Sequence, residues 1–357
     1  MTYPLLIPIG GFLGAGKTTL LARAAQELAA SLGPVAAITN DQAANLVDTS
    51  YLRARGIPCA EVAGGCFCCR FDDFETAAAS LERSHGPRVI LAEPVGSCTD
   101  LAATVVRPWR ELRGRDSAPL TVLIDYERLP QALDPGTPGP LDPDAAYILR
   151  KQLEESDIIL LTKSDTLSAS QVNAALDDLR AAFPGRASIA VSALTGEGVD
   201  EWLRAVRSRE GAPAGARRID VDYDVYARGE AALGWLNARG RVLVGGEGGA
   251  SLARRAVEHL RDACRAEHAA VAHIKVRFER EGDSAQAHAT SDDGDPRTDG
   301  NCPSGEAAMT VNARVQIDPP ALERLARRTL AGLPPAGAEI EELACFSPGR
   351  PVPRHRL

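Results

Sequence analysis

One segment near the start of the chain combines residue types and spacing that suit phosphate binding. Residues 11–18 read Gly-Phe-Leu-Gly-Ala-Gly-Lys-Thr. Glycines let the backbone turn with positive φ, so that consecutive N–H groups can converge on phosphate oxygens at a helix N-terminus. The apolar run 5–9 before the segment and the helical pattern of 20–32 after it supply the strand and helix that a phosphate-binding loop requires. We expect phosphate contacts from Gly11, Gly14, Ala15, Gly16, Lys17, Thr18 and Thr19, with Lys17 on the β- and γ-phosphates and the Thr18 hydroxyl on Mg²⁺.

Two carboxylates follow apolar strands and extend this prediction. Asp41 comes after the run 35–39, and Glu93 comes after the run 88–92. Ligands of α/β sheets bind at the carboxyl ends of strands. Asp41 would contact Mg²⁺ through water or orient the attacking water, unless it caps the following turn. Glu93 would hold the Mg²⁺ shell through water, unless it is an ordinary strand-end residue, and the Gly96 N–H would reach the γ-phosphate. We thus expect catalysis to involve Lys17, Asp41 and Glu93, and Mg²⁺ to be bound by Thr18, Asp41 and Glu93.

A later pair of strand ends has the groups needed to recognise a base. The run 157–161 leads into Thr-Lys-Ser-Asp, and the run 187–191 leads into the segment 192–198. The Asp165 carboxylate can accept both ring N–H groups of guanine, which adenine does not present in that arrangement. The Lys163 stem can lie across the base plane. We expect the base to be bound by Thr162, Lys163, Asp165 and the backbone amides of Ser192 and Ala193.

Three cysteines within four residues indicate a metal site. Residues 64–69 read Gly-Gly-Cys-Phe-Cys-Cys. In an extended segment Cys66 and Cys68 face the same way, and a turn would bring in Cys69. Soft thiolates suit Zn²⁺ or Cu(I). Three ligands leave one position open, which suits a metal that is passed on. Buried structural cysteines or a redox pair are the alternatives. Cys59 and Cys98 are further candidate ligands, and Cys98 is alternatively a small buried residue.

The composition is that of a protein with two domains. The chain has 357 residues, which is long for one core, and a formal net charge of −8 without a long Lys/Arg run. This disfavours nucleic-acid or anionic-membrane partners. No apolar stretch has the length of a membrane span, and the first residues lack the features of a signal peptide. We therefore expect a cytoplasmic protein whose eight cysteines stay reduced.

The order of expected elements predicts a P-loop, three-layer α/β domain with a mostly parallel sheet over residues 1–208. A linker rich in Gly and Ala follows at 209–217. Residues 218–346 alternate as β-α-β-β-α-β, the pattern of a ferredoxin-like α+β domain. Within it, the polar, Gly-rich segment 281–306 is expected to be a mobile loop, with an auxiliary metal-holding role as the alternative. The Pro- and Arg-rich tail 347–357 is expected to be unstructured.

Together these motifs resemble the CobW-type GTPase metallochaperones, which are related to the nickel-insertion GTPases HypB and UreG. The matching segments are 11–18, 39–41, 65–69, 93–96 and 162–165. The resemblance covers about six-tenths of the chain, and the cysteine loop is its most specific part. It implies hydrolysis of GTP coupled to release of a divalent metal, commonly Zn²⁺ or Co²⁺, to a client metalloprotein. It also implies a nucleotide-dependent homodimer.

Two departures from the family pattern bear on these expectations. The family usually has Asn at the position of Thr162, and a Thr hydroxyl lacks the paired amide that contacts the base. The family also often carries a His-rich stretch, whereas the six histidines of this chain are scattered. Two other functions are consistent with the motifs. One is a regulatory GTPase with a structural zinc that gates a cofactor-dependent enzyme. The other is a P-loop small-molecule kinase, in which Asp165 would have no guanine to read.

Overall fold

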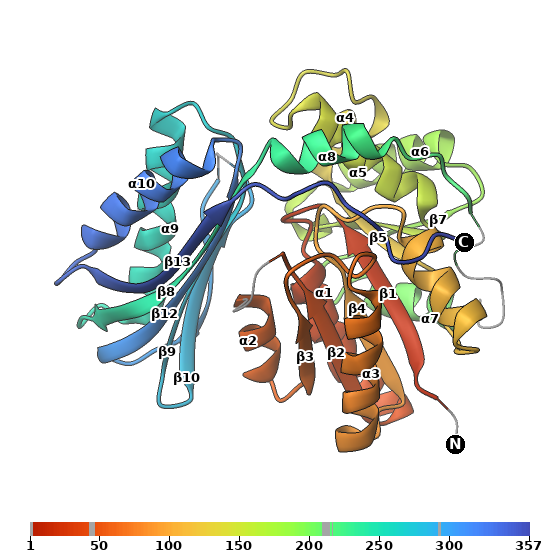
Figure 1. Cartoon of the computed structure of the whole chain (residues 1–357), viewed down its shortest axis with the longest axis horizontal. Helices are drawn as coiled ribbons and strands as arrows, with labels where there is room; N and C mark the ends of the chain where they lie inside the picture. The colour runs from red at the N-terminus through yellow and green to blue at the C-terminus, as the bar shows by residue number, and fades with distance from the viewer. Residues whose placement is uncertain (1–2, 43–46, 209–214, 216, 292–293) are drawn as a thin grey trace.

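The computed structural model describes residues 3–42, 47–208, 215, 217–291 and 294–357. The chain forms two bodies, each built on its own sheet (Figure 1). The expected linker 209–217 lies almost wholly outside the described residues. Among the described helices, none is both long and apolar enough to cross a membrane.

The first body contains a seven-stranded parallel sheet in the order β3-β2-β4-β1-β5-β6-β7. Its strands are β1 (Leu5–Gly11), β2 (Val35–Asn40), β3 (Cys59–Val62), β4 (Val89–Glu93), β5 (Thr121–Asp125), β6 (Ile158–Thr162) and β7 (Ala187–Ala190). Strands β2, β4, β5 and β6 are buried along their whole length, because helices cover both faces of the sheet. The prediction of an α/β domain with a mostly parallel sheet is confirmed.

Helices of this body connect the strands. They are α1 (Lys17–Leu32), α2 (Val47–Arg53), α3 (Phe71–His85), α4 (Leu129–Leu133), α5 (Pro143–Glu155), α6 (Ala169–Ala182) and α7 (Val199–Ser208). Two short π-helical segments cover Ala102–Val106 and Pro108–Leu112, and two 3₁₀ turns cover Tyr126–Arg128 and Ser164–Thr166. Since all strands run parallel, their carboxyl ends lie at one edge, where the predicted site residues gather.

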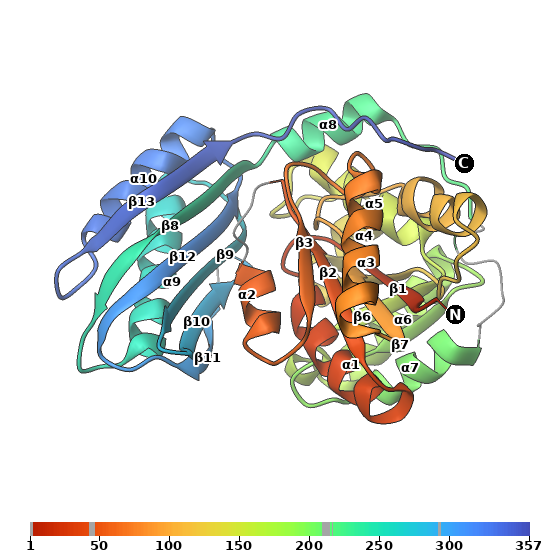
Figure 2. The same ribbon diagram turned by 60° about the horizontal axis from the view of Figure 1, so that its bottom comes forward.

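The second body is a six-stranded antiparallel sheet in the order β11-β10-β9-β12-β8-β13. Its elements are β8 (Gly234–Val244), α9 (Gly249–Ala266), β9 (Val271–Arg280), β10 (Asp283–Ala289), β11 (Arg297–Asn301), β12 (Gly305–Val315), α10 (Pro319–Ala331) and β13 (Ala338–Phe346). Helices α9 and α10 cover one face, and the other face looks towards the first body (Figures 1 and 2). Without β10 and β11 the order is the predicted β-α-β-β-α-β.

The segment 281–306 contains a β-hairpin, so the prediction of a mobile loop is wrong. Strand β10 pairs with both β9 and β11. Ala285, Ala287 and Ala289 alternate towards the core and are buried. Alanine is depleted in strands, so the alternation of these three alanines with polar residues was only a weak signal for a strand.

Two segments outside the sheets join the bodies. Helix α8 (Tyr223–Ala231) packs on α5 of the first body, and a Cβ at Gly229 would lie 2.4 Å from the Asp144 oxygen. The tail was predicted to be unstructured, which is wrong. It runs back over the first body, where the Arg354 N–H donates to the Cys68 oxygen (2.8 Å) and the Leu357 N–H donates to the Ala103 oxygen (2.9 Å).

The three tryptophans are fully buried at three separate places. The Trp109 ring lies 5.3 Å from that of Phe74, next to the cysteine loop. The Trp202 indole N–H donates to the Thr121 hydroxyl at 3.0 Å, beneath the first sheet. Trp235 stacks beneath the Arg314 guanidinium, 4.2 Å away, where the two bodies meet.

Candidate functional site

The predicted phosphate-binding loop has the backbone geometry that its sequence requires. Gly11 has φ +134°, and a Cβ there would lie 2.7 Å from the Leu123 oxygen, so only glycine fits. Gly16, with φ +91°, precedes α1 and offers no side chain to its first N–H groups. Lys17 Nζ donates to the oxygens of Gly11 (2.7 Å) and Phe12 (3.2 Å). Burial lowers the pKa of Lys17 to about 8 against the opposing effect of Glu93. An anion in the loop would stabilise this ammonium.

The Thr18 hydroxyl lies between two carboxylates, and only one of them was predicted. Its Oγ1 is 2.9 Å from Glu93 Oε1 and 2.9 Å from Asp48 Oδ1. Burial and the nearby Asp48 raise the pKa of Glu93 to about 7. Glu93 Oε2 is buried and has no hydrogen-bond partner among the described residues. Three convergent oxygen donors with an unused carboxylate oxygen fit the hard oxygen ligation of Mg²⁺.

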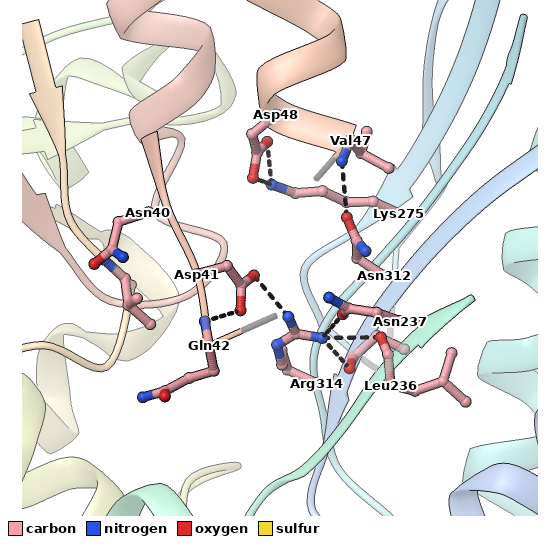
Figure 3. A network of polar contacts seen from close by, with 12 residues as sticks. Asn40, Asp41, Gln42, Val47, Asp48, Leu236, Asn237, Lys275, Asn312 and Arg314 are labelled. Carbon is pink, nitrogen blue, oxygen red and sulfur yellow. Dashed lines mark hydrogen bonds and ion pairs between the residues drawn. The ribbon is translucent and has the colours of Figure 1, made fainter. Parts of the chain in front are cut away.

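Asp48 was missed because it lies in the first turn of the short helix α2 rather than following a strand. Burial alone would raise the pKa of Asp48, but Lys275 and hydrogen bonds from Lys275 and Thr18 outweigh it and lower the pKa. Lys275, from β9, donates to both carboxylate oxygens at 2.6 and 2.8 Å (Figure 3). The Asp48 carboxylate is therefore charged and shared between the two bodies.

Asp41, the other predicted Mg²⁺ residue, pairs with the second body instead. Its Oδ2 accepts from Arg314 Nη2 at 2.7 Å (Figure 3). Arg314 is fully buried and also donates to the Leu236 oxygen (2.9 Å) and to Asn237 Oδ1 (2.8 Å). The structure gives Asp41 no hydrogen bond to Thr18 or Glu93. In this structure Asp41 therefore contacts the second body, while Asp48 is the carboxylate that joins Glu93 beside Thr18.

The predicted base-binding residues lie at the ends of β6 and β7. The Thr162 hydroxyl donates to the Ala15 oxygen (2.8 Å) and the Ile124 oxygen (3.2 Å), so it braces the phosphate-binding loop. Lys163 Nζ lies 3.2 Å from Asp125 Oδ2 and 3.0 Å from the Thr290 hydroxyl.

The remaining base-binding predictions concern one carboxylate and two amides. Asp165 Oδ2 is 3.6 Å from Nη2 of Arg297, a residue of β11. The Ser192 N–H donates to the Glu197 oxygen at 2.9 Å, which leaves the Ala193 amide as the candidate donor to a base carbonyl. Gly96 lies against the loop, because a Cβ there would meet Leu13 N at 2.9 Å.

The three predicted metal ligands form one cluster. Their sulfur atoms lie 2.8 Å apart for Cys66 and Cys68, 3.2 Å for Cys66 and Cys69, and 3.7 Å for Cys68 and Cys69. Hydrogen bonds with Cys66 and Cys69, together with burial, raise the pKa of Cys68 well above its usual range. The cluster is therefore a set of mutually hydrogen-bonded thiols, which would have to release protons in order to bind a metal ion.

The two other candidate cysteines differ in position. Cys59 Sγ is 3.9 Å from the Thr39 hydroxyl and lies outside the cluster. Cys98 is fully buried, and hydrogen bonds from Cys66 and Cys68 lower its pKa to about 6. The fourth thiol next to the cluster is thus Cys98, on the loop that follows Glu93.

One buried side chain, Asn40 at the end of β2, forms hydrogen bonds both with the cysteine loop and with the segment that follows Glu93. Asn40 Nδ2 donates to the oxygens of Val62 and Gly65, both at 2.8 Å. Asn40 Oδ1 accepts from the Phe67 N–H (2.8 Å) and, at 3.4 Å, from the Val95 N–H. The same amide therefore holds the cysteine loop and the segment that follows Glu93.

The tail covers the exposed side of the cluster. The Val352 N–H donates to Cys69 Sγ at 3.2 Å, and the His355 ring meets the Phe71 ring edge-on at 5.3 Å. Cys66 and Cys68 are 2% and 1% exposed, whereas Cys69 is partly exposed. Access to the sulfur atoms therefore passes beside residues 352–355.

Comparison with known proteins gives one family match. The model of the "CobW/HypB/UreG, nucleotide-binding domain" family matches residues 5–190. Among solved structures, HypB from Helicobacter pylori in complex with nickel is similar at 15% identity and a TM-score of 0.44, over 61% of this chain and 92% of that chain. The Zn(II)-bound YjiA GTPase from E. coli is similar at 13% identity and a TM-score of 0.37, over 94% and 100%. No curated protein matched.

Proposed function

Because the chain belongs to the CobW/HypB/UreG family of nucleotide-binding proteins, we propose that it is a GTP-hydrolysing metallochaperone. It binds a divalent metal ion through Cys66, Cys68 and Cys69 and delivers the ion to a client metalloprotein in a step coupled to GTP hydrolysis. Zn²⁺ is the cargo that we propose first and Co²⁺ the second, since thiolates bind both. A cytoplasmic location and a nucleotide-dependent homodimer are parts of the same proposal.

The Asn40 side chain is the observation that carries the proposal. It bonds the cysteine loop on one side and the Val95 N–H on the other. Val95 lies between Glu93 and Gly96, the two predicted contacts to Mg²⁺ and the γ-phosphate. A shift of this segment on hydrolysis changes the hydrogen bonds that hold the cysteine loop, and thereby the affinity for metal. By linkage, bound metal changes the affinity for nucleotide by the same factor.

The residues of the nucleotide site have separable roles in this proposal. Lys17 and the amides of the loop bind phosphate, and Asp165 selects guanine. Thr18, Asp48 and Glu93 hold Mg²⁺, which when bound neutralises charge on the β- and γ-phosphates. The Gly96 N–H is positioned by its packing on Leu13 to reach the γ-phosphate side of the loop.

A regulatory GTPase with a structural zinc is the second candidate. The burial of Cys66 and Cys68 favours it, because closed structural sites are buried and contribute to folding. In that case, removal of zinc lowers the temperature of global unfolding. In the chaperone, removal of zinc changes the cysteine loop but leaves the temperature of global unfolding unchanged.

The test is a titration of reduced protein with Zn²⁺ and with Co²⁺, in the presence of a non-hydrolysable GTP analogue, of GDP, or of no nucleotide. We expect the metal affinity to differ between the nucleotide states by about 5- to 150-fold, the range of typical coupling free energies. The Cys66→Ser/Cys68→Ser/Cys69→Ser variant should lose tight binding. Cys345→Ser, which removes a thiol of the second body, is the matched control.

Two results would count against the chaperone. One is a metal affinity that is equal in all nucleotide states. The other is tight binding that survives loss of the three thiols. Thermal unfolding of the apo and zinc-bound protein then decides whether the structural-zinc candidate takes its place.

A further inference from the structure

Strand β9 of the second body brings a lysine to the phosphate end of the nucleotide site. Lys275 Nζ donates to both Asp48 oxygens (Figure 3). Asp48 Oδ1 also accepts from the Thr18 hydroxyl at 2.9 Å. The ammonium is therefore two hydrogen bonds from the hydroxyl that marks the Mg²⁺ position. A Mg²⁺ ion held at Thr18 would bring the β- and γ-phosphates of a nucleotide to this end of the site, where the second body supplies the Lys275 ammonium.

Backbone contacts hold β9 and β10 in place over the loop. A Cβ at Gly14 would lie 2.9 Å from Thr290 Cβ and 3.1 Å from the Ala272 oxygen. Arg128 Nη2 donates to the oxygens of Ala272 (3.0 Å) and Thr290 (2.7 Å), while Nη1 binds Asp125 at 2.6 Å. The strand that carries Lys275 is thus attached to the first body at a distance of a few residues from the lysine.

Side-chain alternation turns Lys275 towards the first body. Ile274 and Val276 are buried in the core of the second body. His273 and Lys275 therefore share the opposite face. His273 is buried, and its Nδ1 has no hydrogen-bond partner among the described residues. This face of β9 therefore offers a bound ligand a second polar group, the His273 Nδ1 atom, besides the Lys275 ammonium.

Binding of Mg²⁺ and GTP would change the charges around Lys275 and offer its ammonium group a new hydrogen-bond acceptor. Asp48 and Glu93 are the carboxylates nearest to Thr18, and Mg²⁺ would bind both. The ion pair between Asp48 and Lys275 would then be weaker, because the Asp48 carboxylate would also be bound to Mg²⁺. The γ-phosphate oxygens are the strongest acceptors that arrive with the Mg²⁺, and a lysine ammonium is a suitable point charge for them.

We propose that Lys275 is a phosphate-binding residue of the GTP site, supplied by the second body, and that it moves from Asp48 to the γ-phosphate when Mg²⁺ and GTP bind. The inference rests on the proposed GTPase function and adds a residue to it. In hydrolysis a water oxygen bonds to the γ-phosphorus, the bond to the β–γ bridging oxygen breaks with its electron pair on GDP, and the water protons pass to phosphate and solvent. Lys275 keeps its protons and stabilises the charge of the γ-phosphate.

The experiment compares full-length wild type with Lys275→Ala and Lys275→Met, and uses Lys151→Ala as the matched control. Lys151 pairs with Glu154 on α5 at 2.8 Å, away from the site. The probes are a non-hydrolysable GTP analogue and GDP, each with Mg²⁺, and GTP for steady-state hydrolysis. We expect both Lys275 variants to lose about 10- to 100-fold in affinity for the GTP analogue and to keep their GDP affinity within about threefold. The kcat should fall at least tenfold, and the control should match wild type.

The ratio of GTP-analogue to GDP affinity separates phosphate binding from a structural effect. Loss of domain docking or of folding weakens both nucleotides together, whereas loss of a γ-phosphate contact weakens only the analogue. A ratio equal to that of wild type, or tighter binding of the analogue by the variants, overturns the inference. Lys275 would then only hold Asp48 in position. A wild type that binds no GTP analogue contradicts the proposed GTPase function, and the inference falls with it.

Discussion

The carboxamide oxygen of Asn40 accepts a hydrogen bond at 2.8 Å from the backbone N–H of Phe67, the residue between Cys66 and Cys68. This hydrogen bond therefore fixes the distance between the end of β2 and the cysteine loop. Asn40→Ala removes this bond and the bonds to Gly65 and Val95. We expect the variant to bind metal but to lose most of the effect of nucleotide on metal affinity. Paired titrations with GTP analogue and GDP measure this effect. An unchanged ratio would show that the coupling takes another route.

The two acidic residues that flank the segment after β2 should differ in the effect of their removal. Asp48→Asn removes the charge of a proposed Mg²⁺ ligand, so we expect GTP hydrolysis to fall at least about tenfold and to need more Mg²⁺. Asp41→Asn leaves the buried Arg314 without its charge partner, so we expect a loss of about 3 kcal/mol in the free energy of unfolding. Mg²⁺ titrations of hydrolysis and urea unfolding report the two quantities. The reverse pattern would return Asp41 to the catalytic set.

Base selectivity should depend on the carboxylate at the end of β6. Asp165→Asn replaces a double acceptor by one acceptor and one donor, which no longer fits the two N–H groups of guanine but fits xanthine. We expect GTP affinity to fall about 10-fold or more and XTP affinity to rise. Competition of GTP, XTP and ATP against a fluorescent nucleotide checks this. If ATP competes best in the wild type, the kinase alternative takes precedence.

The tail should slow metal exchange. Val352→Pro removes the N–H that donates to Cys69 Sγ at 3.2 Å, while the side chain at this position is exposed. A single weak hydrogen bond is worth about 0.5–1.5 kcal/mol, so we expect transfer of Zn²⁺ to a chelator to become about 2- to 10-fold faster. Val352→Ala keeps the N–H and is the control. Equal transfer rates in all three proteins would exclude a covering role for this contact.

A buried carboxyl group should make stability depend on pH. Burial raises the pKa of Glu155 to about 8 from 4.5, with the Asp100 charge adding to the rise and the Ala102 N–H opposing it. Between these values the folded protein holds a proton that the unfolded chain has lost. Stability therefore falls as pH rises, by about 1.4 kcal/mol per pH unit for this group.

Glu155→Gln mimics the protonated acid and should remove this part of the slope. Urea unfolding between pH 5 and pH 8 measures it, with Glu154→Gln as the neighbouring control. Glu230, whose pKa burial also raises to about 8, keeps its own contribution in both variants. A variant with the slope of wild type would mean that Glu155 is charged in the folded protein.

The sequence predicted the first domain well because its signals are local. The phosphate-binding loop, the strand ends at Glu93 and Asp165, and the cysteine triplet each lie within a few residues of the apolar run that positions them. The parallel sheet follows from those buried runs. The guanine preference and the identity of the metal stay predictions, since the site contacts alone do not select them.

What the sequence did not predict depends on contacts between distant residues. Lys275 and Asp48 are 227 positions apart, and Arg314 and Asp41 are 273 apart. No local pattern marks either pair. Asp48 is the second residue of the seven-residue helix α2, so it carried no strand-end signal. The order of the tail depends on its hydrogen bonds to the Cys68 and Ala103 oxygens rather than on its own composition, so no local pattern predicts it.

The three buried tryptophans give this chain three built-in optical probes. Trp109 contacts Phe74, whose ring lies 4.7 Å from that of Phe67 in the cysteine loop, so we expect its emission to change if the cysteines bind a metal ion. Trp235 lies under Arg314, so its emission follows separation of the two bodies. Trp202 lies beneath the first sheet and serves as the internal reference. With two of the three replaced by phenylalanine, the remaining tryptophan would report separately on the proposed metal release or on the contact between the two bodies.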